Sequence, residues 1–349
     1  MNKKTFCLSL CVFLLLSSSA FAQNSDKKSE KKLSRLFRTQ VILPLKMSYS
    51  NNELRKNTND STFIKSKISY KEKDSWKDLD VEIRARGNFR RERCYFVPVK
   101  LKIKKSKSKG TLFKGQKKLK LVVPCLNSKD MNDNVLKEYI AYKIYENISK
   151  YNFKTRLVQI SLSEIKGKKT KEHSLKGFLI EDDKNVADRF SAKVIDRSIH
   201  PLKQDDITSI QNAFFQYMIG NVDFSIAKLH NAKLFYIEKT IVPVPYDFDM
   251  NGFVDPSYET VSSRPKNSFL INKVTQRKFR GYKRELQLFE QVRQQFLNNK
   301  TKFLTIIESF ENQFENESEY SKAKEYLLDF FKVLESDKSF KSEILDEMR

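Results

Sequence analysis

Alternation between apolar and polar positions dominates the chain from Thr39 to Pro124. A repeat of two residues is typical of β-strands that bury one face and expose the other. We therefore expect this part to form a mainly antiparallel sheet. The clearest predicted strands cover residues 63–70, 81–84, 99–103 and 119–123.

The period of the pattern changes after Pro124. Apolar spacing predicts a helix over residues 134–148, with Asp133 placed to cap its start, and a second helix over 207–219 that opens after Asp205-Asp206. Pro243 and Pro245 indicate an edge position or a strand end for the last predicted strand. The other predicted elements are strands at 157–162, 175–180, 234–237 and 241–244, and helices within 284–348.

This order of elements predicts an α+β fold. Residues 39–349 form one domain in this interpretation, with a sheet-rich lobe at about 39–181 and a helix-rich lobe at about 182–349.

The first 22 residues have the three parts of a cleavable secretory signal peptide. Two lysines precede an apolar run from Phe6 to Leu16, and the small-residue site Ala20-Phe21-Ala22 follows, so we expect cleavage after Ala22. The polar residues 23–38 are predicted to be a flexible leader. The apolar run is too short to span a bilayer, and no later stretch is long and apolar enough. We therefore expect an exported protein, periplasmic or extracellular, without a membrane span.

The formal net charge of the chain is +24, and it is +22 without the predicted signal peptide. Lysines are spread along the whole sequence, which indicates a solvated basic surface rather than a nucleic-acid stripe, so we expect no specific nucleic acid. An acidic glycan or an acidic lipid surface is a plausible partner. Removal of the signal leaves Cys94 and Cys125, which flank predicted strands of one sheet. In an oxidising compartment they are expected to form a disulfide; the alternative is two buried thiols.

Several familiar catalytic motifs are missing from the sequence. Residues 110–117 nearly fit a Walker A loop, but Gln116 stands where lysine is required, so we interpret the segment as a turn. The sequence has no H-E-x-x-H, C-x-x-C or G-x-S-x-G motif, which leaves zinc-peptidase, redox and serine-hydrolase functions without support.

Acidic and amide side chains gather in the sequence between Phe214 and Asp255. They occur in Asn221-Val222-Asp223, in Leu229-His230-Asn231 and in Asp247-Phe248-Asp249. Such oxygen ligands suit Mg²⁺, and phosphoryl transfer requires one aspartate to accept the proton of the hydroxyl together with metal-holding Asn and Asp residues. In the alternative interpretation, Asp223 and Asp249 cap turns while Asp247 pairs with a lysine.

A calcium loop is a second alternative for the same segment. Positions 1, 3, 5, 6 and 9 of an EF-hand loop are matched by Asp247, Asp249, Asn251, Gly252 and Asp255. Position 12 is Tyr258 rather than glutamate, and the two prolines before the loop exclude an entering helix.

Several segments of the chain, in the order in which they occur, resemble the CotH kinase family, which comprises atypical kinases related to spore coat protein H. The resemblance is closest to exported members of this family in Gram-negative bacteria. The match covers about half of the chain, from Ile83 to Asp255. Its segments are Arg86-Gly87-Asn88, Pro98 to Lys102, Gly177 to Glu181, Asn221 to Asp223, His230-Asn231 and Asp247 to Asp249.

The resemblance implies a two-lobed kinase-like fold that binds ATP and Mg²⁺ between its lobes and phosphorylates a protein hydroxyl. It implies that Asp223 is the catalytic aspartate, that Asn231 and Asp247 hold the metal, and that Glu181 lies near the adenine. Asp249 is a further candidate metal ligand, and Lys102 and Lys120 are both candidates for the lysine that binds phosphate. The alternative is a non-catalytic secreted binding module, either a pseudokinase or a Ca²⁺-binding loop.

Overall fold

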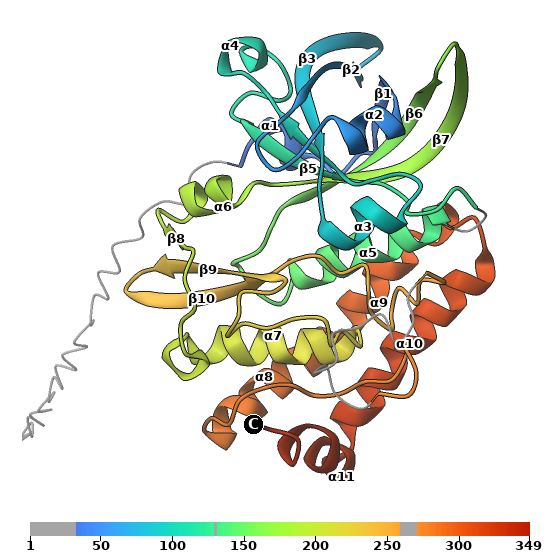
Figure 1. The fold of residues 1–349 in the computed structure, drawn as a ribbon. Helices are drawn as coiled ribbons and strands as arrows, with labels where there is room; N and C mark the ends of the chain where they lie inside the picture. Colours follow the sequence, from blue (N-terminus) through green and yellow to red (C-terminus); the bar gives the residue numbers. More distant parts are fainter. Residues whose placement is uncertain (1–32, 129–130, 259–270) are drawn as a thin grey trace, which may run out of the picture.

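The computed structural model describes residues 33–128, 131–258 and 271–349. The predicted signal peptide and most of the predicted leader lie outside these residues. The described part is a mixed α+β structure, with strands concentrated in its first half and helices in its second (Figure 1). None of its helices is both long and apolar enough to cross a membrane.

Seven strands of the described chain close into a barrel in the order β1-β2-β3-β4-β5-β7-β6. All neighbours pair antiparallel except β1 and β6, which pair in parallel with Leu45 opposite Ile160. The strands are β1 Leu43–Tyr49, β2 Ile64–Glu72, β3 Ser75–Ala85, β4 Val99–Lys102, β5 Lys118–Val122, β6 Thr155–Lys166 and β7 Lys169–Ile180.

The barrel confirms the predicted antiparallel strands and explains their alternation. Alternate residues such as Val81, Ile83, Leu101 and Leu121 point inward, are almost completely buried, and form one core inside the barrel. The parallel contact between β1 and β6 that closes the barrel was not predicted from the sequence.

The second half of the described chain contains most of the helices and a three-stranded sheet in the order β10-β9-β8. The sheet strands are β8 Lys193–Ile195, β9 Ala232–Ile237 and β10 Thr240–Pro245. The short helices beside the barrel are α1 Arg35–Arg38, α2 Asn51–Lys56, α3 Asn88–Arg93 and α4 Lys105–Ser108. The other helices are α5 Met131–Tyr145, α6 Asp183–Arg189, η1 Pro201–Lys203, α7 Asp206–Met218, α8 Leu286–Asn298, α9 Lys300–Glu308, η3 Glu311–Gln313, α10 Glu317–Glu335, α11 Asp337–Phe340 and η4 Lys341–Leu345.

Two details of the helix predictions have different outcomes. The predicted helix α7 is present and begins at Asp206, one residue earlier than predicted, because Asp205 is its N-cap and accepts a hydrogen bond of 2.9 Å from the backbone N–H of Thr208. The predicted capping role of Asp133 is wrong. Asp133 lies inside α5, fully buried, and its carboxylate accepts hydrogen bonds from the backbone N–H groups of Glu315 and Asn316.

The boundary of the predicted leader also needs correction. Helix α1 lies within residues 23–38, and its Leu36 and Phe37 are buried in the barrel core. Packed structure therefore begins before Thr39, because these two apolar side chains interrupt the polar segment. The edge position predicted from the prolines is confirmed, since β10 pairs only with β9 in the described sheet.

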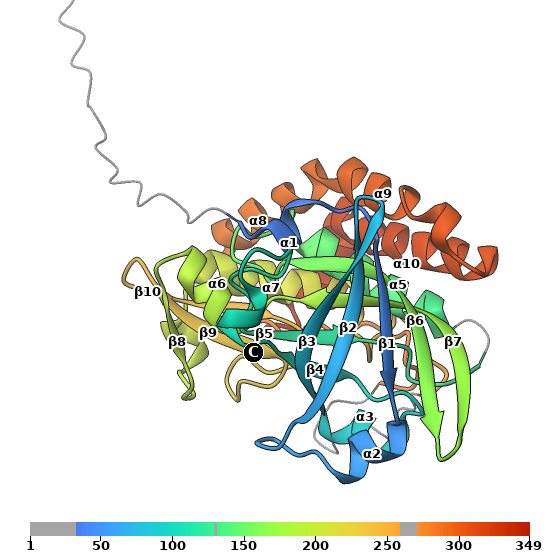
Figure 2. The ribbon, with the colours of Figure 1, turned by 90° about the horizontal axis from the view of Figure 1, so that it is seen from above.

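A second hydrophobic core joins α5, α7, α8, α9 and α10. In Figures 1 and 2, α8 to α10 lie below the barrel and behind it, while α5 lies between the barrel and these helices. Tyr139 and Tyr142 of α5 pack against Phe178 of β7, with ring centroids 5.7 and 5.5 Å apart. Helix α5 therefore connects the two cores.

The predicted disulfide is present between Cys94, which follows α3, and Cys125, which follows β5. Both cysteines are buried, and their Cα atoms are 4.5 Å apart. The bond attaches α3 to the end of a barrel strand.

Candidate functional site

Asp223 lies in the segment that follows α7, and neighbouring polar groups fix its carboxylate. Its Oδ1 lies 2.9 Å from His230 Nε2, and its Oδ2 accepts a hydrogen bond of 3.2 Å from Asn231 Nδ2. The same amide also donates to the Asp223 carbonyl at 2.7 Å, while Asn221 Oδ1 accepts from the Asp223 N–H. About a fifth of the Asp223 side chain is exposed, at 19%. The carboxylate is therefore oriented and still accessible.

Asp247 begins the segment after β10 and lies beside the Asn231 segment. The N–H of Tyr246 donates to the carbonyl of Asn231 at 3.1 Å, which joins the two segments just before Asp247. Asp247 has a left-handed backbone, with φ of 67°, and its own N–H donates to the hydroxyl of Tyr142 at 2.8 Å. The structure thus brings together three predicted site residues, Asp223, Asn231 and Asp247.

Backbone hydrogen bonds also connect the end of α7 to the segment after Asp249. Gly252 N–H donates to Gly220 O at 3.3 Å, and Phe253 N–H donates to Ile219 O at 3.0 Å. Gly220 has φ of 64°, and a Cβ placed there would lie 2.0 Å from the hydroxyl of Tyr326. Glycine adopts this left-handed backbone without strain, and a larger residue at position 220 would also displace the Tyr326 side chain.

Positive side chains from the barrel surround Asp247. Within the described chain its carboxylate makes one ion pair, at 3.9 Å with Arg86, and accepts no hydrogen bond. Burial opposes ionisation of Asp247, but the charges of Arg86, Arg90 and Lys120 outweigh it and hold the pKa of Asp247 below its ordinary value. Asp247 is therefore an ionised carboxylate that accepts no hydrogen bond from described residues, and a cation bound there would compete with Arg86.

Lys120 of β5 is the predicted lysine that the structure brings to this cluster. Burial, reinforced by the charge of Arg86, lowers the pKa of Lys120 to about 7. Its Nζ lies 4.1 Å from the ring centroid of Tyr246 and 5.2 Å from that of Phe153. A lysine held close to neutrality among aromatic rings would gain charge when an anion binds beside it.

Lys102, the other predicted lysine, is placed differently. It lies on β4 with 44% of its side chain exposed, and its Nζ pairs with Glu82 of β3 at 2.7 Å. The ring of Phe63 lies 5.2 Å from the same ammonium group. The described contacts of Lys102 are therefore with its own strand neighbours.

Asp249 belongs to a buried ion pair that the sequence did not reveal. Its Oδ2 accepts a hydrogen bond of 2.5 Å from Arg90 Nε, and the same guanidinium reaches Glu138 of α5 at 3.3 Å. Burial raises the pKa of Asp249 despite Arg90, and it raises the pKa of Glu138 to about 8. This pairing with an arginine was not among the roles predicted for Asp249, which were metal binding or the capping of a turn, and it fixes α3 against α5.

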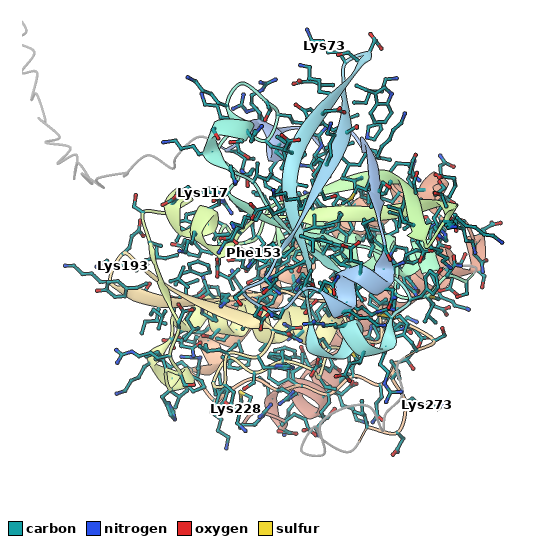
Figure 3. The ribbon with its side chains drawn as sticks, turned by 45° about the horizontal axis from the view of Figure 1, so that its top comes forward. Lys73, Lys117, Phe153, Lys193, Lys228 and Lys273 are labelled. Carbon is teal, nitrogen blue, oxygen red and sulfur yellow. A yellow bond between two sulfur atoms is a disulfide. The ribbon has the colours of Figure 1, made fainter. Side chains whose placement is uncertain are left out.

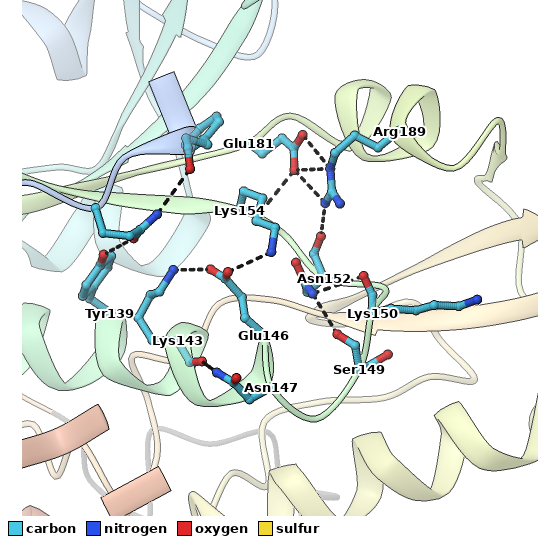
Figure 4. A network of polar contacts seen from close by, with 12 residues as sticks. Tyr139, Lys143, Glu146, Asn147, Ser149, Lys150, Asn152, Lys154, Glu181 and Arg189 are labelled. Carbon is cyan, nitrogen blue, oxygen red and sulfur yellow. Dashed lines mark hydrogen bonds and ion pairs between the residues drawn. The ribbon is translucent and has the colours of Figure 1, made fainter. Parts of the chain in front are cut away.

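Glu181 directly follows the end of β7, where a network of polar contacts holds it (Figure 4). Its carboxylate pairs with Arg189 of α6 at 3.0 Å and accepts from the N–H of Lys154 at 3.2 Å. Burial raises its pKa, and Arg189 partly offsets that effect. The side chain of Glu181 thus joins the end of β7 to α6, and Asp182 and Asp183 follow it directly in the chain.

Two donors in the cluster fit a hard cation. The carboxylate of Asp247 and the amide oxygen of Asn231 accept no hydrogen bond from described residues. Mg²⁺ is commonly held by one or two protein oxygens, with substrate phosphates and water completing its shell. In residues 33–128, 131–258 and 271–349, no group of three or more His, Cys, Asp or Glu side chains is arranged to hold a metal ion. The protein alone therefore offers a partial shell.

The calcium-loop alternative has fewer free donors. Asn251 is fully buried, its amide donates to Phe248 O, and its Oδ1 accepts from Val254 N–H. Asp249 is paired with Arg90, and the segment before the loop is strand β10.

Sequence reasoning missed Glu138 and Arg90, as well as the contact of His230 with Asp223. Arg90 lies four residues after Arg86 of the Arg-Gly-Asn segment, so that segment was a signal for a basic contribution to the site. Nothing in the sequence signalled Glu138, whose role depends on where α5 packs. Among known proteins, no family model matches the chain and no curated protein matches it.

Proposed function

We propose that this protein is an atypical kinase that transfers a phosphoryl group from Mg²⁺-ATP to a protein hydroxyl. The observation that carries the proposal is the joint placement of Asp223, Asn231 and Asp247, with Lys120 of the barrel close enough for its charge to lower the pKa of Asp247. This set contains the base, the metal-holding pair and the phosphate-binding cation that phosphoryl transfer requires.

Asp223 is the proposed base in this mechanism. His230 and Asn231 hold its two carboxylate oxygens, so that the group faces one direction and can accept the proton of an incoming hydroxyl. Asn231 would use its amide oxygen, and Asp247 its carboxylate, to hold Mg²⁺, which would compete with Arg86 for Asp247. The metal ion, when bound to the phosphates, neutralises the negative charge that develops on them.

Lys120 is the proposed phosphate-binding residue. Its pKa of about 7 rises when an anion approaches, so binding of phosphate would be coupled to full protonation of the lysine. The order of elements supports the kinase-like interpretation, because the strand of Lys120 is followed by helix α5 and by hairpin β6–β7, which ends at Glu181. In protein kinases the corresponding lysine pairs with a helix glutamate. Here Glu138 pairs with Arg90 instead.

The experiment combines a binding assay with a transfer assay on the folded protein. Thermal unfolding is measured with Mg²⁺-ATP, Mg²⁺ alone and Ca²⁺ alone, and transfer of the γ-phosphate to casein is measured with labelled ATP. At one hundred times its Kd, a ligand adds about 2.7 kcal/mol to stability, which raises Tm by several degrees. Only Mg²⁺-ATP is expected to give this rise.

Four variants assign the roles. Asp223→Asn should retain nucleotide stabilisation and lose transfer by at least about a hundredfold. Asp247→Asn and Lys120→Gln should lose stabilisation by Mg²⁺-ATP. Lys102→Gln is the matched control and should behave as the wild type, because Lys102 contacts Glu82.

Three outcomes would contradict the proposal. Full transfer by Asp223→Asn would exclude its role as the base. Stabilisation by Mg²⁺-ATP without any transfer would indicate a pseudokinase. Stabilisation by Ca²⁺ alone would favour a non-catalytic calcium-binding module.

A further inference from the structure

The segment between Cys94 and Ser128 contains ten lysines and no acidic residue. It forms β4, α4, the turn after α4, and β5. Figure 1 shows α4 at the upper edge of the barrel, on the side away from α8 to α11. The lysines of this segment are Lys100, Lys102, Lys104, Lys105, Lys107, Lys109, Lys114, Lys117, Lys118 and Lys120.

Part of this segment surrounds a hollow of about 570 Å³, which we call the lysine hollow. Its lining consists of Lys105, Ser106, Ser108, Lys109, Lys114, Gly115, Gln116 and Lys117. The turn that forms one wall is the segment predicted to be a turn rather than a Walker A loop, and Gly115 gives it a left-handed backbone with φ of 88°. Gln116 is buried and accepts from Asn185 of α6 at 2.9 Å, which fixes this wall against α6.

The lysines that line the hollow differ from nearby lysines of the same segment in whether they form ion pairs with acidic residues. Lys107 pairs with Asp80, while Lys102 and Lys104 pair with Glu82. The four lining lysines are exposed and make no ion pair with any residue that the structure describes. Figure 3 shows Lys117 on the outer surface, on the same side of the molecule as α4 and α6. Four uncompensated cations around one hollow create a positive potential that an anion would neutralise.

The chemistry of the lining restricts the class of ligand. No aromatic side chain lines the hollow, so nucleic-acid bases have nothing to stack on. No large apolar side chain lines it either, so an acyl chain has no anchor there. The walls are lysine stems, with the Ser106 hydroxyl and backbone between them, and these surfaces suit the faces and hydroxyls of sugars.

We propose that the lysine hollow binds an acidic polysaccharide, with Lys105, Lys109, Lys114 and Lys117 contacting its anionic groups. None of the eight lining residues belongs to the cluster around Asp223 and Asp247, so this inference is independent of the proposed kinase activity. The site would hold the protein on an anionic glycan while other parts of its surface stay free.

The test measures binding of the full protein to polygalacturonate by calorimetry at about 50 mM and about 200 mM salt. One variant replaces Lys105, Lys109, Lys114 and Lys117 by glutamine. A matched control replaces four other exposed lysines without described ion pairs, which are Lys168, Lys169, Lys171 and Lys203. Both variants lose the same total charge, and unfolding curves check that both are folded.

We expect the hollow variant to bind at least about tenfold more weakly, and the control to stay within about twofold of the wild type. Binding of the wild type should weaken at the higher salt concentration. Equal loss in both variants, or no binding by the wild type, would overturn the proposal. Vesicles with anionic lipids and single-stranded DNA are measured in parallel. A larger effect of the hollow variant on either of these ligands than on polygalacturonate would also overturn it.

Discussion

Tyr142 determines where Asp247 lies, because one side chain makes three different contacts. Its ring packs against Phe178 of the barrel and lies 4.5 Å from the ring of Phe248, and its hydroxyl accepts from the N–H of Asp247. Tyr142 is only 2% exposed, and its hydroxyl is the acceptor that the structure provides for the Asp247 N–H, so loss of the hydroxyl would leave that N–H poorly satisfied.

We therefore expect Tyr142→Phe to lower the free energy of unfolding by about 1–3 kcal/mol, measured by urea denaturation. Tyr145→Phe on the same helix is the matched control, because the buried Tyr145 hydroxyl lies beside Ser149 and makes no contact with Asp247. That control should change stability by less than about 1 kcal/mol. Equal losses in the two variants would mean that the contact with Asp247 contributes nothing.

The surroundings of a second residue, Glu164, predict how the stability of the protein depends on pH. Its buried carboxylate accepts hydrogen bonds from Asn51 at 2.9 Å and Tyr95 at 2.7 Å, and it contacts His173 at 2.8 Å. Burial favours the neutral carboxyl, but these hydrogen bonds outweigh it and hold the pKa of Glu164 below its ordinary value. A lowered folded-state pKa adds stability above the ordinary pKa, and that stability is lost as pH falls through the folded-state value.

Glu164→Gln should therefore cost about 1.5–3 kcal/mol at pH 7, and the gap to the wild type should narrow below about pH 4. Urea denaturation of both proteins at pH values from about 3 to about 8 measures the free energy of unfolding, and therefore both the cost of the substitution and its decrease in acid. Glu172→Gln, on the exposed side of β7, is the control and should show neither effect. A gap that stays constant across the acidic range would contradict the assigned cause.

At the scale of elements, helix α3 depends on the disulfide that follows it. The helix has only six residues, yet it carries Arg90, which pairs with Asp249 and Glu138. A helix of this length is not stable by itself. The bond from Cys94 to Cys125 and the Arg90 contacts therefore hold it against the barrel and α5.

Replacing Cys94 and Cys125 by alanine should lower the free energy of unfolding by about 3–4 kcal/mol, given the 31-residue separation. It should also speed amide hydrogen exchange in α3 more than in α7, because α7 is packed in the helical core. Denaturation and exchange mass spectrometry measure the two effects. Loss of stability with unchanged exchange in α3 would show that the disulfide does not position this helix.

The elements that could be predicted from the sequence are those with a regular repeat of apolar residues or with a recognisable capping residue at a helix start. Strands such as β2 and β5 alternate regularly, and α7 has Asp205 at its start, so local rules were sufficient. Strand β8 has only three residues, which is too short for a pattern. The parallel pairing of β1 with β6 joins residues more than one hundred positions apart, and no local rule specifies it.

The same distinction applies to the site. Asp223, Asn231 and Asp247 were predictable because carboxylates and amides at strand ends and turns are a local signal. Lys120 could not be separated from Lys102 by sequence, since both are lysines on alternating strands. Their different surroundings arise from tertiary packing, which places Tyr246 beside Lys120 and Glu82 beside Lys102. The pairing of Asp249 with Arg90 is likewise a long-range contact.

At the scale of the whole molecule, the two hydrophobic cores share the hairpin β6–β7. Leu157 and Phe178 belong to the helical core, while Val158 and Leu179, the next residues along the strands, belong to the barrel core. The strands β6 and β7 are therefore buried on both faces here. If the hairpin separated from one core, residues of the other core would also become exposed to solvent. This arrangement predicts that both parts of the described chain unfold together.

The single tryptophan allows a direct test, because Trp76 lies on β3 of the barrel whereas circular dichroism at 222 nm reports mainly on the helices. Leu121→Ala in the barrel core should cost about 2–5 kcal/mol, and Phe330→Ala in the helical core about 3–5 kcal/mol. Each variant should shift the fluorescence and dichroism transitions by the same amount, since a cavity in either core weakens the shared hairpin. If Phe330→Ala lowered the dichroism midpoint while the Trp76 transition stayed in place, the barrel would be an independent folding unit, and the hairpin would not couple the cores.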